Sequence, residues 1–250
     1  GVIIKGKTFL YNEKDIMSIK RLLTFSIIII LTTALLYGKT NLSESRIDIL
    51  ADIESQAITF LQDNDGFIWI GTIIDGVYRY DGKTLQRYLG PDHKIAGSNI
   101  PCIFEDSKGN LWFADNGRGV HRYDKERNTI TSYSHDPKNS NSISSNSFYW
   151  SGRQVIVEDK FGEIWIGTYG GGLNRLDQKT GSIKRYQHDP NDSTSLSNNG
   201  IRSIFLDSGG NLWIGTEKGL NLFDDKSETF SHYFPDKKNP NSISGKVVSS

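Results

Sequence analysis

Residues 207–216 read Asp-Ser-Gly-Gly-Asn-Leu-Trp-Ile-Gly-Thr, and this polar turn followed by an apolar run occurs four times in the 250-residue chain. In each copy a glycine follows the first aspartate by three residues and a tryptophan follows it by six. The tryptophans lie 43, 53 and 48 residues apart. Such a period indicates an architecture in which every repeat is one supersecondary unit. The residues that carry the pattern are Asp63, Gly66 and Trp69; Asp106, Gly109 and Trp112; Asp159, Gly162 and Trp165; and Asp207, Gly210 and Trp213.

Each repeat predicts four strands, which we name A to D. Strand A is the apolar run before the aspartate, as in residues 201–206, and strand B contains the tryptophan. Strand C is a second glycine-led segment, as in residues 219–224. Strand D ends at a tyrosine, which is Tyr88, Tyr133, Tyr186 or Tyr233.

The aspartate and glycine predict a tight turn between strands A and B. An aspartate carboxylate can accept a backbone N–H at the start of a turn, and glycine tolerates positive φ at its end. Strand B is apolar on both faces, with Ile68 and Ile70 opposite Trp69, which is typical of a strand covered on both sides. Four-stranded sheets stacked face to face form a β-propeller. We therefore predict an all-β fold with four blades of four antiparallel strands.

The repeat also sets the expected domain boundaries. We expect blades at about residues 57–97, 98–150, 151–199 and 200–246, after a linker or first-blade start at 39–56. The last ten residues, 241–250, repeat the approach to strand A seen at 195–203. This similarity predicts the start of a fifth blade, and thus an incomplete propeller truncated at the C-terminus.

The N-terminal segment has the features of an export signal. Lys20 and Arg21 follow Met17, and an uncharged stretch from 22 to 38 follows them. As a helix this stretch would span about 25 Å, less than the ~30 Å hydrocarbon core. We therefore favour a signal peptide at 17–38 over an N-terminal membrane anchor. Residues 1–16 precede the only methionine and are interpreted as a non-native or miscalled extension.

The repeat resembles the two-component regulator propeller repeat over residues 57–250. The second copy departs from the pattern, because Ala114 and Asp115 replace Gly-Thr. The resemblance implies the periplasmic sensor region of a hybrid two-component histidine kinase, in which paired seven-bladed propellers precede an immunoglobulin-like domain, a transmembrane helix and the kinase. A cyclic-dinucleotide synthase is an alternative output domain. The resemblance further implies a small-molecule or oligosaccharide ligand and an exported location on the periplasmic side of the inner membrane. It also implies that the downstream blades, a transmembrane helix and the kinase domains are partners of this region. The full-length protein is expected to form a homodimer.

Composition restricts the other classes of partner. The chain has 29 basic and 29 acidic residues, so no overall field attracts nucleic acid, and we expect no nucleic-acid partner in this region. The single cysteine, Cys102, allows no internal disulfide, and its apolar flanks predict a buried thiol. Residues 63–66 resemble part of a calcium loop, but Leu61 occupies its first ligand position. We expect no metal site and no cofactor.

The connections from strand D to the next strand A are the longest and most varied, at 134–150, 187–200 and 234–246. Together with the B–C loops they are predicted to form the binding face, because binding residues concentrate on variable loops. Aromatic rings stack on sugars, so Tyr149, Trp150 and Tyr169 are candidate ligand contacts. The alternative is that they pack into strand A or between blades. Arg118 is a candidate contact for a carboxylate or polar sugar, with a solvated surface charge as the alternative.

Two histidines occupy matching places after strand D. His135 and His188 each precede Asp-Pro, so their recurrence follows the repeat, and we assign no catalytic residue. The asparagine- and serine-rich stretches, such as 139–142, are predicted to be ordinary loops. The alternatives to a sensor region, which is not itself an enzyme, are an exported propeller enzyme such as a lyase, and a secreted adhesion or scaffold propeller.

Overall fold

The computed structural model describes residues 53, 55–88, 95, 99–149, 152–239, 242–245 and 247–248, and the backbone of 2–4 and 7–9. The chain divides into two units, residues 1–48 and 49–250. In the first unit, β1 (Val2–Ile4) pairs antiparallel with β2 (Lys7–Phe9). The predicted signal segment at 17–38 lies outside the described residues.

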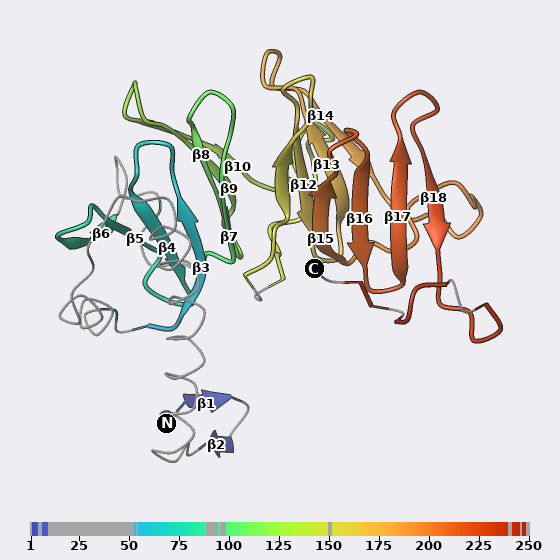
Figure 1. Cartoon of the computed structure of the whole chain (residues 1–250), viewed down its shortest axis with the longest axis horizontal. Helices are drawn as coiled ribbons and strands as arrows, with labels where there is room; N and C mark the ends of the chain where they lie inside the picture. Colours follow the sequence, from blue (N-terminus) through green and yellow to red (C-terminus); the bar gives the residue numbers. More distant parts are fainter. Residues whose placement is uncertain are drawn as a thin grey trace. The chain divides into compact units, whose positions relative to one another are not determined.

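The second unit contains four separate four-stranded antiparallel sheets, each built from strands consecutive in the chain (Figure 1). The described residues contain no helix. The prediction of an all-β fold with four blades of four strands is therefore confirmed. The strands are β3 (Ala57–Gln62), β4 (Ile68–Thr72), β5 (Val77–Tyr80) and β6 (Leu85–Tyr88) in blade 1; β7 (Cys102–Glu105), β8 (Leu111–Asp115), β9 (Gly119–Asp124) and β10 (Thr129–Tyr133) in blade 2; β11 (Ile156–Glu158), β12 (Ile164–Thr168), β13 (Gly172–Leu176) and β14 (Ile183–Tyr186) in blade 3; and β15 (Ile201–Leu206), β16 (Leu212–Thr216), β17 (Gly219–Asp224) and β18 (Thr229–Tyr233) in blade 4.

The predicted A–B turns form as expected. In the second repeat, the N–H of Gly109 donates to the carbonyl of Asp106 at 2.9 Å, and Gly109 adopts a φ of 78°. The Oδ1 atom of Asp106 accepts the backbone N–H groups of Lys108 at 3.0 Å and Asn110 at 2.9 Å. The aspartate thus organises the turn, and the glycine supplies a backbone conformation that other residues adopt at a cost.

The hydrophobic core lies between blades. Three buried clusters each combine residues of two consecutive blades. Trp69, Trp112 and Trp165 are at most 2% exposed, because the next blade covers each of them. For example, the ring of Trp165 lies 4.9 Å from that of Phe223 in blade 4. Each blade therefore depends on its neighbour for burial of its apolar face, as the repeat predicts.

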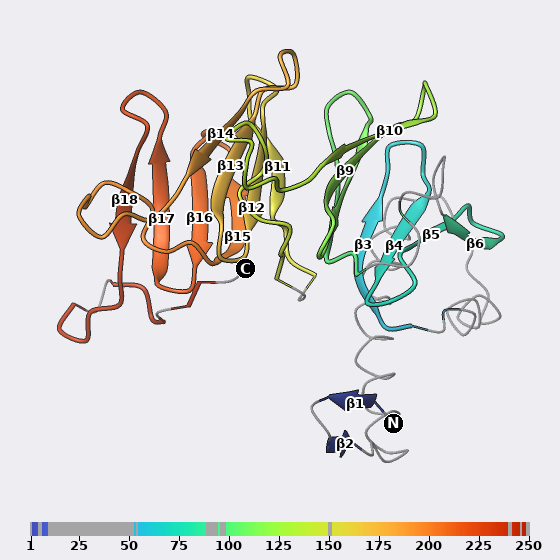
Figure 2. The ribbon, with the colours of Figure 1, turned by 180° about the vertical axis from the view of Figure 1, so that it is seen from behind.

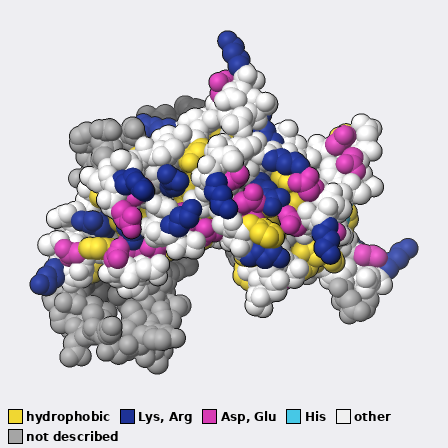
Figure 3. Space-filling view, turned by 90° about the horizontal axis from the view of Figure 1, so that it is seen from above, with side chains coloured by type: hydrophobic (Ala, Val, Ile, Leu, Met, Phe, Trp, Pro, Cys, Tyr) yellow, Lys and Arg dark blue, Asp and Glu magenta, His cyan; other side chains and the backbone are white. Residues whose placement is uncertain are grey.

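The first strands of neighbouring blades lie next to one another. Strand β7 contacts both β3 and β11. Strand β11 also contacts β15 (Figure 2). The turns A–B and C–D emerge at one end of the sheets. Seen from above in Figure 3, that end carries basic and acidic side chains close together.

The described D–A connections are loops, as the sequence predicts, and hydrogen bonds with their serine side chains hold the backbone. In the connection of blade 2, Ser142 Oγ accepts the N–H of Asp136 at 2.9 Å and donates to the carbonyl of Asn139 at 2.9 Å. Ser195 Oγ makes the same two bonds with Asp189 and Asp192. The residue that follows, Ile143, is fully buried in the core between blades 2 and 3. The polar residues therefore fix a loop that inserts an apolar side chain between blades.

Candidate functional site

Two of the predicted ligand contacts, Tyr149 and Tyr169, lie together at the end of the sheets that carries the B–C and D–A connections. Tyr149 is the last residue described before residue 150 in the D–A connection of blade 2. Tyr169 follows β12 in the B–C loop of blade 3. The N–H of Phe148 donates to Asn116 Oδ1 at 2.9 Å, and the N–H of Tyr169 donates to the carbonyl of Ser147 at 2.8 Å. These bonds position both tyrosines against the loops of two blades.

Blade 4 adds two charged side chains to this pair. The guanidinium carbon of Arg202 lies 3.9 Å from the centroid of the Tyr149 ring, and Arg202 also donates to the Tyr149 hydroxyl. Glu217 accepts hydrogen bonds from that hydroxyl at 3.1 Å and from Arg202 Nη2 at 3.1 Å. The Tyr149 and Tyr169 rings meet edge to face at 5.1 Å and 85°. We call Tyr149, Tyr169, Arg202 and Glu217 the tyrosine–arginine cluster.

The electrostatics of the cluster keep the Tyr149 hydroxyl protonated. Partial desolvation, followed by the hydrogen bond to the Glu217 carboxylate, raises the pKa of Tyr149 above its ordinary value. Tyr169 is 44% exposed, so part of its ring is open to solvent. The cluster therefore presents an exposed aromatic ring beside a charged pair and a fixed hydroxyl. Such a surface can stack on an apolar ring face and hydrogen-bond to hydroxyl groups around it.

The predicted site residues have different positions in the structure. Tyr149 contacts the partly exposed Tyr169 and packs against Arg202 of blade 4, which agrees with packing between blades. Its role as a ligand contact stays a prediction. Trp150 lies outside the described residues. Arg118 lies in the B–C loop of blade 2, where its N–H donates to Asp115 O and its carbonyl accepts a bond from Ser134.

Sequence reasoning missed Arg202 and Glu217. Arg202 is a charged residue within the otherwise largely apolar strand β15, and that interruption is the signal that could have identified it. Glu217 is the first residue after the repeated strand B pattern, at the position that Tyr169 occupies in blade 3. Their partnership with Tyr149 spans 53 and 68 residues of sequence, which no local pattern reveals.

The two matching histidines have equivalent places in their loops. His135 Nδ1 lies 2.8 Å from the carbonyl of Ile143, and His188 Nδ1 lies 2.7 Å from that of Leu196. The backbone N–H of each histidine also donates to an asparagine side chain. Each ring therefore supports the loop that carries the buried Ile143 or Leu196.

Within the ranges that the structure describes, no three His, Cys, Asp or Glu side chains converge in the way that a metal ion requires. Across the same residues, no helix is long and apolar enough to span a membrane.

A known family model matches one segment in each of the four repeats. The family model described as the two-component regulator propeller matches residues 53–73, 94–117, 139–170 and 195–218, and each match contains or adjoins a B–C loop. These segments are two-component regulator propeller repeats. Each matched segment contains strands A and B of one blade, and the third and fourth segments contain the tyrosine–arginine cluster.

The chain is similar in sequence to one curated histidine kinase and in fold to solved structures. The chain is 34% identical over 163 residues to Histidine kinase P4 of Formosa agariphila, an alignment that covers 63% of this chain and 11% of that protein. Among solved structures, virginiamycin B lyase from Staphylococcus aureus aligns at 18% identity and a TM-score of 0.54, over 75% of this chain and 58% of the lyase. The extracellular domain of a candidate hybrid two-component system from B. thetaiotaomicron aligns at 22% identity and a TM-score of 0.38, over 75% of this chain and 31% of that domain. The lyase similarity shows the propeller fold alone.

Proposed function

We propose that residues 57–250 belong to the ligand-sensing propeller region of a two-component sensor histidine kinase, exported to the periplasmic side of the inner membrane. The observation that carries this proposal is the set of four two-component regulator propeller repeats, together with 34% identity to a histidine kinase. The alignment covers 11% of that relative's length. A kinase domain and a transmembrane helix in the complete protein are therefore part of what we propose. Dimerisation of the full-length protein is part of the proposal as well.

The ligand that we propose is an oligosaccharide, bound at the tyrosine–arginine cluster. Tyr169 offers an exposed ring face for stacking, while Arg202 and Glu217 supply a donor and an acceptor for sugar hydroxyls. Arg202 lies in blade 4 and Tyr149 in the connection from blade 2 to blade 3, so a ligand that contacts both would stabilise one arrangement of these blades. That coupling is the physical basis on which a propeller could pass on a binding signal.

The alternative functions are an exported lyase-type enzyme and a secreted adhesion or scaffold propeller. The similarity to a lyase is compatible with the first of these, although it concerns the fold alone. The positions of His135 and His188 weigh against it, because their rings bond to the carbonyls of their own loops. Turnover of a lyase substrate that is lost in His135→Ala or His188→Ala would favour the enzyme.

The test uses the complete protein that contains this chain. Glycan-array binding identifies a ligand, and the rate of kinase autophosphorylation with and without that ligand measures the response. We expect Tyr169→Ala and Arg202→Gln to weaken glycan binding about tenfold, as loss of a stacking or charged contact does. Phe161→Ala is the control, since Phe161 is 55% exposed in the A–B turn of blade 3, at the opposite end of the sheets from the cluster. A ligand response unchanged by both cluster substitutions would contradict the proposed site, and absence of any glycan response would contradict the proposed ligand.

A further inference from the structure

The strand C residue that faces the repeat tryptophan is an arginine in three blades. Arg79 pairs with Trp69, Arg122 with Trp112 and Arg175 with Trp165 in the sheet register. Blade 4 has Leu222 at this position, opposite Trp213. The blade fold therefore does not require a positive charge there, and the surroundings of Arg175 and Arg122 differ.

In blade 3 this arginine is neutralised by carboxylates. Arg175 Nε pairs with Glu163 in its own blade, and Arg175 Nη1 lies 3.0 Å from Asp225 Oδ1 in the next blade. Glu163 is the fourth residue after the turn aspartate, and Asp225 directly follows strand C of blade 4.

Around Arg122 of blade 2, amides occupy both of the equivalent positions. Asn110 occupies the position of Glu163, and Gln178 occupies that of Asp225. Within the described part of the chain, Arg122 forms no ion pair, and its buried Nε has no hydrogen-bond partner. Its guanidinium carbon lies 6.0 Å from the centre of the Trp112 ring. A half-buried charge without an ion pair costs free energy, so an anion from outside these residues would stabilise it.

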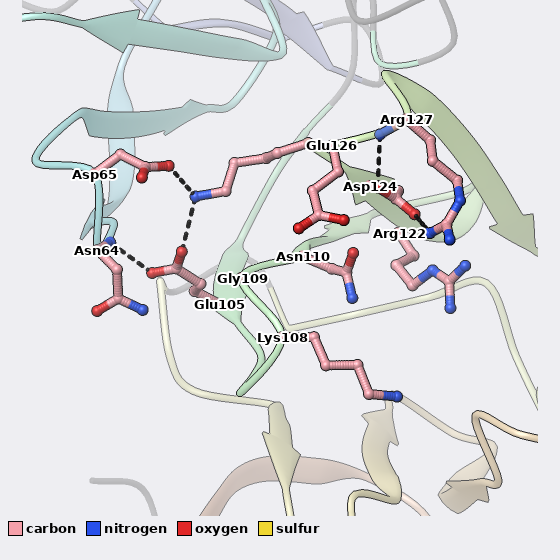
Figure 4. A pocket seen from close by; sticks show the side chains of 11 residues that line it. Asn64, Asp65, Glu105, Lys108, Gly109, Asn110, Arg122, Asp124, Glu126 and Arg127 are labelled. Atoms are coloured by element: carbon pink, nitrogen blue, oxygen red, sulfur yellow. Dashed lines mark hydrogen bonds and ion pairs between the residues drawn. The ribbon is translucent and has the colours of Figure 1, made fainter.

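Arg122 lines a pocket of about 660 Å³ between the A–B turns of blades 1 and 2 and the C–D turn of blade 2 (Figure 4). This volume is in the range that small ligands occupy. The lining residues are Asn64, Asp65, Glu105, Lys108, Gly109, Asn110, Arg122, Asp124, Lys125, Glu126 and Arg127.

Most charges in the pocket are already paired. Lys125 Nζ lies 2.6 Å from Asp65 and 2.9 Å from Glu105, and Arg127 lies 2.7 Å from Asp124. Among the described residues, this leaves Arg122, Lys108 and Glu126 as lining groups without an ion pair. The two cations exceed the one anion, so the unpaired groups favour a ligand with a negative charge.

We propose that this pocket binds the carboxylate or sulfate group of a small ligand, with Arg122 as the main contact and Lys108 as the second cation. A guanidinium offers paired donors that match two oxygens of such a group. Four acidic and four basic residues line the pocket, so it favours a ligand with one anionic group over a polyanion. The site lies at the A–B end of the sheets, whereas the tyrosine–arginine cluster lies at the B–C end, so it is a second site that does not depend on the proposed function.

Isothermal titration calorimetry of the full chain tests this proposal with three probes: glucuronate, glucose 6-sulfate and neutral glucose. We expect at least one anionic sugar to bind, more weakly at high salt, and glucose not to bind. The stronger anionic probe identifies the preferred group. Arg122→Gln is expected to weaken binding about tenfold or more, as loss of a charged hydrogen bond does.

Asn110→Glu provides a second, independent variant. This variant places a glutamate beside Arg122, at the position that Glu163 occupies in blade 3. It should therefore abolish anion binding, while the melting temperature stays close to that of the parent. Lys138→Gln is the control, because it removes the same charge from a D–A connection at the opposite end. The proposal is overturned if neither anion binds, if binding survives both Arg122→Gln and Asn110→Glu, or if Lys138→Gln weakens binding equally.

Discussion

Trp112 and Asp106 are joined by a hydrogen bond in which the indole Nε1 donates to the carboxylate Oδ2 at 2.9 Å. The same bond joins the tryptophan and aspartate of the other three repeats, at 2.8 to 2.9 Å. One carboxylate oxygen holds the backbone of the A–B turn, and the other satisfies the only polar atom of the tryptophan side chain. This double use explains why the aspartate and the tryptophan keep a spacing of six residues in every repeat.

Loss of this bond should destabilise a blade. Asp106→Ala leaves the buried Trp112 N–H without a partner and releases the turn, so we expect the free energy of unfolding to fall by about 2–3 kcal/mol. Urea denaturation followed by tryptophan fluorescence measures the change. Asp192→Ala is the control, because Asp192 bonds only to residues of its own exposed loop. Equal stability of the two variants would contradict this role for the Asp106–Trp112 bond.

The same bond gives the fold a dependence on pH. Hydrogen bonds from the Trp213 indole and then from Asn211 lower the pKa of Asp207 from 3.8 to about 2. Because the pKa of the folded state lies below that of the unfolded state, the stabilisation is complete above about pH 4 and is lost as the pH falls towards 2. Urea midpoints from pH 6 to pH 2 measure this effect. Asp207→Asn should be less stable than the parent at pH 6 and should lose less stability below pH 4, whereas a constant difference at all pH values would contradict the assignment.

The cysteine should be unreactive in the folded protein. Cys102 is 1% exposed, which confirms the predicted buried thiol, and burial raises its pKa to about 11. Thiolate is the reactive form, so we expect reaction with an aromatic disulfide reagent to be slow in buffer and fast in denaturant. Ser227→Cys adds an exposed thiol as a positive control. Rapid labelling of Cys102 in the native protein would contradict this prediction, because it would show that the core between blades 2 and 3 opens to solvent.

The outer face of blade 4 should drive self-association when residues 39–250 are produced alone. Phe205 is 61% exposed, Tyr233 is 41% exposed and Trp213 is half-buried, whereas the next blade covers the corresponding face of blades 1 to 3. Exposed apolar faces of this kind associate in water. Light scattering coupled to size exclusion should detect oligomers, and Phe205→Ser should reduce them. Phe161→Ser, which removes a 55% exposed ring from an A–B turn, should leave them unchanged. A monodisperse monomer that melts cooperatively would contradict the prediction.

The strand pattern could be predicted because its determinants are local. The strands β6, β10, β14 and β18 end at the predicted tyrosines, and strand B coincides with the tryptophan segment in every blade. Asp207, Gly210 and Trp213 lie within seven residues, so the turn, its positive φ and the following strand follow from neighbouring side chains. The hydrogen bond from tryptophan to aspartate was not predicted, although the constant spacing was visible.

The amino-acid sequence by itself determined the four blades, since each is formed by turns and pairings between adjacent segments. Only the tertiary structure decided which side chains of different blades meet. Arg202 joins Tyr149 across 53 residues, and Arg122 lacks a carboxylate because Asn110 and Gln178 stand in separate blades at the positions of Glu163 and Asp225. Such relationships depend on the packing of one sheet against the next, and a repeat pattern specifies that packing only for the residues that every blade shares.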